Sequence, residues 1–217
     1  MGQEAIVKLL IKHGAKLDTD GDLYGTPLQA AVKAGHEAVV EILLDNRADV
    51  NFAGYVLRPA WQIAVALGNE KMDRLLLDRG ASVQAQDYND ALRASVQPGL
   101  EEMVRFLVEK GADVNTQSGE LGTILMAAAA RGAKEIAELL IEEGAEINQQ
   151  GGFYGTTLQA ATMEGHEDIV RLLLENGADM NLRGGPYGSA LRAASIGGHE
   201  NIVRLLETAA KVSTEEN

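Results

Sequence analysis

Apolar residues along the chain follow a helical spacing that returns with a longer period of 33 residues. Within each period the apolar side chains lie three and four residues apart, which places them on one face of a helix. One column of this face is leucine throughout, and a glycine or arginine ends each of the first six helices four residues later. The leucines are Leu10, Leu43, Leu76, Leu107, Leu140, Leu173 and Leu206, and the turn residues are Gly14, Arg47, Gly80, Gly111, Gly144 and Gly177, at spacings of 33, 33, 31, 33 and 33. The pattern predicts one helix with a buried face in every period.

A shorter segment before each of these helices predicts a second helix per period. Its paired alanines, as in Ala160–Ala161, allow a close approach to neighbouring helices. A polar residue stands at its start, where a side-chain oxygen can accept a hydrogen bond from a free backbone N–H group. These expected N-cap residues are Thr26, Asp90, Thr123, Thr156 and Ser189. Glycine-rich connectors such as residues 149–155 predict hairpin turns between the periods.

A fixed period of this length predicts a stack of similar supersecondary units, which commonly serves recognition. The motifs Thr-Pro-Leu-x-x-Ala, Gly-His-x-x-x-Val-x-x-Leu-Leu and Gly-Ala-Asp-Val-Asn resemble the ankyrin repeat, from Gln3 to about residue 210. The resemblance implies a mainly α solenoid of stacked helix-turn-helix units joined by β-hairpin turns. We expect a single array over residues 1–211, with a half-repeat at 3–18, six units to about 210, and a frayed tail at 212–217. The Gly-Gly-x-Tyr-Gly-x-x-Leu-Gln-Ala-Ala form is similar to the ankyrin arrays of large fungal multidomain proteins.

The repeat pattern is least regular between residues 47 and 99. Trp61 takes the place of a first-helix leucine and is expected in the core, whereas Asp73 falls in an apolar column. The unit from Gly80 to Gly111 is two residues short, and the loss falls in the expected hairpin at 84–90. The histidine that usually follows Thr-Pro-Leu in the family is absent, so its hydrogen bonds to the hairpin must be replaced or lost. That column holds Gln29, Gln62, Arg93, Met126, Gln159 and Arg192.

Composition narrows the class of partner. The 217 residues are 46% hydrophobic and 4% aromatic, so the core must be built from small and aliphatic side chains. The formal net charge of −13 argues against nucleic acid or an anionic membrane as the ligand, because phosphate would be repelled. The sequence has no cysteine, no signal peptide and no apolar stretch long enough to span a membrane. We therefore expect a soluble cytoplasmic protein.

Two motifs resemble catalytic or cofactor-binding chemistry without meeting its requirements. Three His-Glu pairs occur, but a zinc peptidase needs a second histidine four residues after the first, where this chain has Val40, Val170 and Val203. The glycine-rich segments 151–155 and 184–188 precede helices like phosphate loops, but they lack the preceding strand and the Gly-Lys-Ser/Thr sequence. We expect structural histidines, hairpin glycines, no metal, no cofactor and no enzymatic activity.

The remaining candidates are residues in the columns that vary between ankyrin repeats. The resemblance implies that hairpin tips and first helices form a concave face that binds proteins. Large apolar and arginine side chains in those columns are typical of binding hot spots. The candidate partner-binding residues are Leu23, Tyr55, Val56, Arg58, Arg131, Phe153 and Met163.

The most direct interpretation is therefore a monomeric protein-interaction module that binds a protein or peptide. The sequence starts inside a repeat, at the second helix, which favours either a half-repeat cap or a segment of a longer chain. The second possibility suggests an alternative function, as a sensor or autoinhibitory segment of a larger signalling protein. A small-molecule site or an enzyme in the irregular region 47–99 is a more remote alternative.

Overall fold

The computed structural model describes residues 3–19, 21, 24–52, 58–97 and 99–215. They fall into two compact units, Met1–Asp87 (unit 1) and Tyr88–Asn217 (unit 2). Unit 1 contains α1 (Gln3–Lys12), α2 (Pro27–Lys33), α3 (Glu37–Asp45), α4 (Ala60–Ala66), α5 (Glu70–Asp78) and the start of α6 (Ala85–Ser95). Unit 2 contains the rest of α6, α7 (Glu101–Glu109), the 3-10 helix η2 (Gly119–Leu121), α8 (Ile124–Arg131), α9 (Lys134–Glu142), β1 (Gln150–Gly151), β2 (Gly155–Thr156), α10 (Thr157–Glu164), α11 (Glu167–Glu175), α12 (Ala190–Gly197) and α13 (Glu200–Glu215).

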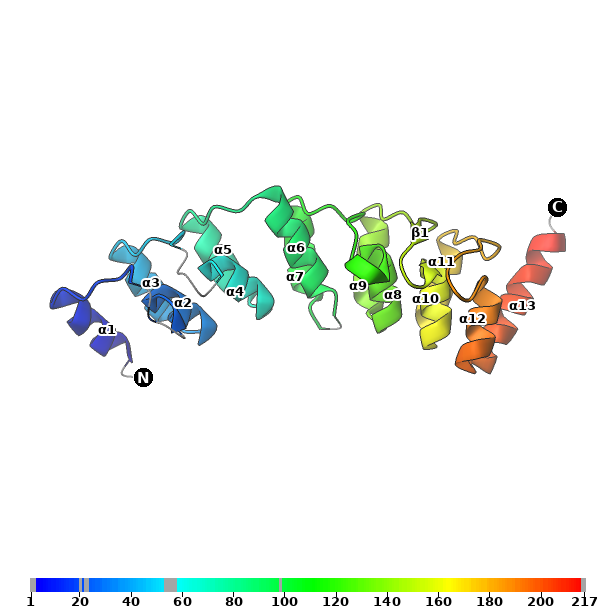
Figure 1. The fold of residues 1–217 in the computed structure, drawn as a ribbon, viewed down its shortest axis with the longest axis horizontal. Coiled ribbons are helices and arrows are strands. Elements are labelled where there is room, and N and C mark those ends of the chain that lie inside the picture. Colours follow the sequence, from blue (N-terminus) through cyan, green and yellow to red (C-terminus); the bar gives the residue numbers. More distant parts are fainter. Residues whose placement is uncertain (1–2, 20, 22–23, 53–57, 98, 216–217) are drawn as a thin grey trace. The chain divides into compact units, whose positions relative to one another are not determined.

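Each unit is built from repeats in which a first helix packs against the second helix that follows it. The pairs are α2 with α3 and α4 with α5 in unit 1, and α8 with α9, α10 with α11 and α12 with α13 in unit 2. Neighbouring repeats pack like on like: α10 lies between α8 and α12, and α11 contacts α9 and α13 (Figure 1). The predicted mainly α fold of stacked helix pairs is confirmed.

The leucine column of the second helices forms the spine of the core. Six of its seven members are no more than 2% exposed, whereas Leu10 in α1 is 54% exposed. Leu10 differs because α1 packs on α3 while no first helix among the described residues covers its other side. Trp61 is 4% exposed in α4, so its predicted place in the core is confirmed.

The predicted caps are confirmed for four first helices and wrong for the fifth. The side chains of Thr26, Thr123, Thr156 and Ser189 each accept a hydrogen bond from the backbone N–H three residues later. Asp90 instead lies inside α6, which begins at Ala85, and forms an ion pair with Arg93. The shortened connector explains the difference. With two residues missing, the chain forms an earlier helix start in place of the expected hairpin, and Asp87 accepts from the N–H of Gln84 at 2.8 Å.

In two repeats, hydrogen bonds from a glutamine replace those of the missing family histidine. In Gln29, the side-chain oxygen accepts from the N–H of Thr26 at 2.8 Å, and the amide nitrogen donates to the carbonyl of Arg58 in the next repeat at 3.0 Å. With its amide oriented so that both ends are satisfied, Gln159 donates to the carbonyls of Tyr154 and Gly184 and accepts from Ser189. Gln29 therefore ties its first helix to the segment just before α4, and Gln159 ties its first helix to the hairpin segments on either side.

Asparagines join consecutive repeats on the turn side of the second helices. Asn148 donates to the carbonyl of Gly177 at 3.0 Å and accepts from the N–H of Asp179 at 2.9 Å. Asn51 and Asn115 form the same two hydrogen bonds, each with the repeat that follows its own. Each side chain thus pairs with one backbone carbonyl and one backbone N–H group just after a second helix, which would otherwise bond to water.

Asn148→Ala is expected to lower the free energy of unfolding by about 1–2 kcal/mol, because two hydrogen bonds between repeats are lost. Urea denaturation followed by far-ultraviolet circular dichroism measures the change. Asn181→Ala is the matched control, since Asn181 occupies the same column but its side chain forms no hydrogen bond to another described residue. The control is expected to cost less than about 0.5 kcal/mol. Equal losses of unfolding free energy in the two variants would contradict a stabilising role for the asparagine hydrogen bonds between repeats.

The hairpins of unit 2 stack closely enough to require glycine. Strands β1 and β2 pair antiparallel, with Gly151 opposite Gly155, which confirms the predicted hairpin turn. At its tip, the N–H of Phe153 donates to the carbonyl of Glu120 in the preceding hairpin at 2.7 Å. A Cβ atom on Gly152 would lie 2.4 Å from the backbone nitrogen of Gly122. The position of Phe153 is thus set by backbone contact between two hairpins.

Candidate interaction surface

Four of the seven predicted partner-binding residues can be placed in the structure. Leu23, Tyr55 and Val56 lie outside the described residues. Arg58 precedes α4 in unit 1 and is exposed. Arg131 at the end of α8, Phe153 at the tip of the β1–β2 hairpin and Met163 in α10 all belong to unit 2. We call the surface made by the hairpins and first helices α8, α10 and α12 the first-helix face of unit 2.

Three aromatic rings form a cluster on this face. The ring of Phe153 meets those of Tyr154 and Tyr187 edge-on, with centroids 5.2 and 6.1 Å away. The two tyrosine rings stack with centroids 6.5 Å apart. Tyr154 is 9% exposed, whereas Phe153 keeps 55% of its surface exposed. The two tyrosine rings therefore pack against the phenylalanine ring and hold it in a solvent-exposed position.

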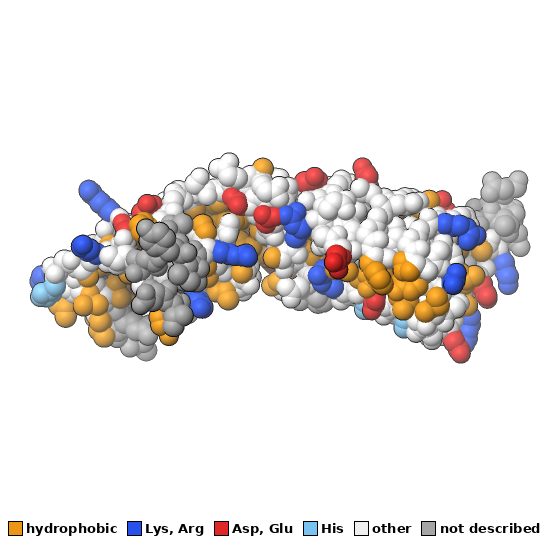
Figure 2. Space-filling view, viewed as in Figure 1, with side chains coloured by type: hydrophobic (Ala, Val, Ile, Leu, Met, Phe, Trp, Pro, Cys, Tyr) orange, Lys and Arg blue, Asp and Glu red, His pale blue; other side chains and the backbone are white. Residues whose placement is uncertain are grey.

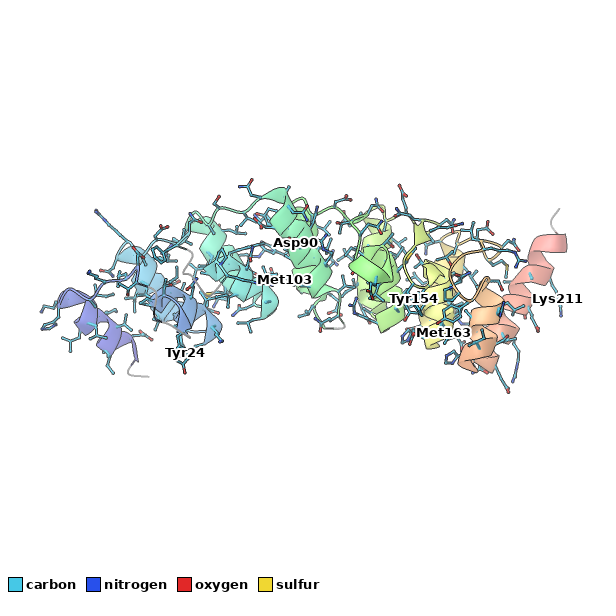
Figure 3. All side chains as sticks on the ribbon, viewed as in Figure 1. Tyr24, Asp90, Met103, Tyr154, Met163 and Lys211 are labelled. Carbon is cyan, nitrogen blue, oxygen red and sulfur yellow. The ribbon has the colours of Figure 1, made fainter. Side chains whose placement is uncertain are left out.

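A hydrogen bond connects the aromatic cluster to the far end of α10. The hydroxyl group of Tyr154 donates to Oε1 of Glu164 at 2.7 Å, beside Met163 (Figure 3). Burial, this hydrogen bond and the charge of Glu164 raise the pKa of Tyr154 to about 12, while Arg131 on α8 opposes the rise. The hydroxyl group therefore stays protonated at neutral pH, and Arg131 lies near enough to act on it electrostatically. Arg131, Phe153 and Met163 all belong to the elements that form the first-helix face of unit 2.

Several residues of this face were missed among the sequence-based candidates. Tyr154 and Tyr187 each belong to a Tyr-Gly pair that replaces the family's usual residues before the first helix. That departure from the family's usual residues was the available signal for these two tyrosines. Ile196 on α12 is 53% exposed. Ile196 occupies the column of Met163, so repeat alignment also indicates it.

Comparison with protein families identifies the repeat. The family described as Ankyrin repeats (3 copies) matches residues 1–53 and 125–216, and Ankyrin repeats (many copies) matches residues 91–141. The chain belongs to the ankyrin repeat family. A comparison with curated protein sequences finds no match.

Two solved ankyrin domains illustrate the likeness. The human ASB11 ankyrin repeat domain is 25% identical with a TM-score of 0.72, over 89% of this chain and 87% of that one. The ankyrin repeat domain of Bcl-3, whose title calls it a unique member of the IkappaB protein family, is 26% identical with a TM-score of 0.69. That match covers 89% of this chain and 90% of Bcl-3.

Two histidines of the ankyrin array, His166 and His199, connect repeats. His166 Nε2 lies 3.3 Å from the carbonyl of Ala130, and His199 Nε2 lies 2.9 Å from that of Met163, both in the first helix of the preceding repeat. Their rings also lie where a Cβ atom on Gly132 or Gly165 would be. The structural interpretation of these histidines is confirmed. Among the described residues, no group of three His, Cys, Asp or Glu side chains could hold a metal ion.

The helices of the array are short. Over the described part of the chain, none is long and apolar enough to cross a membrane.

Proposed function

We propose that this ankyrin array is a non-enzymatic module that binds a partner protein through the first-helix face of unit 2. Ankyrin repeat domains typically mediate protein–protein interactions, and the family match supports such a role. The observation that carries the choice of face is the half-exposed ring of Phe153, which packs edge-on against the buried ring of Tyr154. An aromatic side chain held rigidly loses little entropy on binding, which is typical of an interface hot spot.

The surroundings of Phe153 have the other features of an interface core. Ile196 adds an exposed aliphatic side chain, and Met163 is an adaptable, partly buried one. Arg131 supplies a charged group able to form paired hydrogen bonds with a carboxylate. Apolar anchors with an arginine beside them are what protein interfaces concentrate at their centre.

The proposal is tested by affinity capture with the Phe153→Ala/Met163→Ala double variant. Removing two central anchors is expected to weaken binding at least about 30-fold, the size of a hot-spot loss of about 2 kcal/mol. Wild-type and variant arrays are immobilised equally, and proteins captured from a cell lysate are quantified by mass spectrometry. We expect at least one protein to be held by the wild type and lost by the variant.

Leu9→Ala/Leu10→Ala is the matched control for lost apolar surface. Leu9 and Leu10 in α1 are 56% and 54% exposed, close to the value for Phe153, but they belong to unit 1. Circular dichroism confirms that both variants are folded. Capture that is unchanged in the Phe153/Met163 variant, or lost equally in the control, would refute the first-helix face as the binding surface.

A further inference from the structure

Charge is distributed unevenly between the first-helix face and the second helices of unit 2. The hairpin and first-helix segments 115–131, 148–164 and 181–197 contain three arginines and two glutamates. The second helices α9, α11 and α13 contain nine acidic and four basic residues. The second helices of unit 2 are therefore more acidic than these hairpin and first-helix segments, which within the bounds given contain one more arginine than glutamate.

The basic residues of the two sides also differ in their partners. One cation on each second helix is neutralised by an acid four residues away: Lys134 by Glu138 at 3.1 Å, Arg171 by Glu167 at 2.7 Å and Arg204 by Glu200 at 3.2 Å. Arg131, Arg183 and Arg192 of the first-helix face are exposed and form no ion pair with any described acid. Their guanidinium groups thus keep their donors for an external acceptor.

These arginines accompany the exposed apolar side chains of the same face. Figure 2 shows hydrophobic side chains gathered over α8, α10 and α12, with Lys or Arg side chains beside them. The exposed apolar residues include Phe153 at 55% and Ile196 at 53%. Of the two acids on this side, Glu164 already accepts the hydroxyl hydrogen bond of Tyr154. An apolar centre with free arginines around it is complementary to apolar anchors flanked by carboxylates.

We propose that the first-helix face of unit 2 binds an acidic amphipathic peptide segment of its partner, an inference that rests on the proposed function. Apolar side chains of the segment pack on Phe153 and Ile196, and its carboxylates pair with Arg131 and Arg192. A nucleic acid strand fits less well, because its continuous phosphates would be held beside second helices that carry nine acids. Discrete carboxylates between apolar side chains place negative charge only at the arginines.

The experiment selects ligands for the full chain from a display library of random 16-residue peptides and compares the selected pool on variants. We expect enrichment of Asp and Glu together with Leu, Ile and Phe. Arg131→Glu/Arg192→Glu is expected to weaken the selected peptides at least tenfold by fluorescence anisotropy. Arg171→Glu/Arg204→Glu makes the same change in net charge on the second helices and is expected to weaken them less than threefold. Circular dichroism verifies the fold of both variants.

The other outcomes separate the two proposals. Peptides that are neutral or basic, yet lost on the Phe153→Ala/Met163→Ala array, would overturn the acidic segment and leave the proposed function standing. No selected peptide, or peptides indifferent to all first-helix variants, would overturn both. A labelled oligothymidylate that binds more tightly than the selected peptides, and is lost on Arg131→Glu/Arg192→Glu, would overturn the peptide in favour of a nucleic acid.

Discussion

Replacing Asp73 with valine is expected to raise the free energy of unfolding of unit 1 by about 3–5 kcal/mol at neutral pH. The side chain of Asp73 in α5 is 0% exposed, and neither carboxyl oxygen has a hydrogen-bond partner among the described residues. The same column holds Val40 in α3 and Val170 in α11, which are also 0% exposed. Valine therefore fits a site that the repeat already forms, and the cost of burying an unsatisfied carboxyl group is removed.

The same residue is expected to make unit 1 less stable as the pH rises. Burial, followed by the charge of Glu70, raises the pKa of Asp73 from 3.8 to about 8. The folded state keeps the proton up to about pH 8, whereas the unfolded chain releases it above about pH 4. Between these values the folded state binds more protons, so the free energy of unfolding falls by about 1.4 kcal/mol per pH unit. The contribution of protonated Asp73 to the free energy of unfolding is complete below about pH 4 and is lost once the pH passes about 8.

Trp61 allows both effects to be measured in unit 1. It is the only tryptophan of the sequence and lies 4% exposed in α4, so its fluorescence reports the unfolding of this unit. Urea titrations at about pH 5 and about pH 8 are expected to show a wild-type midpoint that falls with pH more steeply than that of Asp73→Val. Asp73→Asn is the control, because it removes the titration but keeps a buried polar group, and it should stabilise less. Equal midpoints for wild type and Asp73→Val at both pH values would contradict the buried, unpaired carboxyl group.

Most of the fold could be predicted from the sequence because the same local signals recur in successive repeats. The leucine column, the Thr or Ser caps and the glycine that follows most second helices are local signals, and their agreement over several copies fixes the register of the stack. Even the irregular Trp61 was placed correctly, since its column is buried in the neighbouring repeats. The structure of α6 could not be predicted in the same way. Removing two residues from a connector leaves no template, and Asp87 competes successfully with Asp90 as the capping carboxylate.

The candidate surface was less accessible to sequence reasoning than the fold. Column alignment identified Phe153 and Met163, because it shows which positions lie outside the core. It could not show that Tyr154 extends to Glu164, or that three rings from two hairpins converge. These contacts depend on the separation of adjacent hairpins, which is a tertiary quantity. That Arg131 and Arg192 form no ion pair with a described acid likewise emerges only from the tertiary structure.

The close approach of adjacent hairpins predicts the second large effect. Gly152→Ala is expected to destabilise unit 2 strongly. Gly152 has a φ of +58° and lies against the preceding hairpin, where an added Cβ would meet Gly122 N at 2.4 Å and Leu121 C at 2.5 Å. These are backbone atoms, which cannot rotate away as the end of a side chain could. We expect a loss of about 2–5 kcal/mol, combining left-handed strain of about 1–2 kcal/mol with overpacking of about 1–3 kcal/mol.

Gly119→Ala separates the two contributions. Gly119 has the same φ of +58°, but nothing lies within 4 Å of the Cβ position. It should therefore show only the strain of about 1–2 kcal/mol, and the difference between the variants measures the contact between hairpins. Urea denaturation followed by circular dichroism gives both values. Because Phe153 follows Gly152 and its N–H bonds to Glu120, Gly152→Ala should also weaken partner binding, whereas Gly119→Ala should weaken it far less. Equal stability of the two variants would show that the hairpins have room to separate, and the rigid placement of Phe153 would no longer hold.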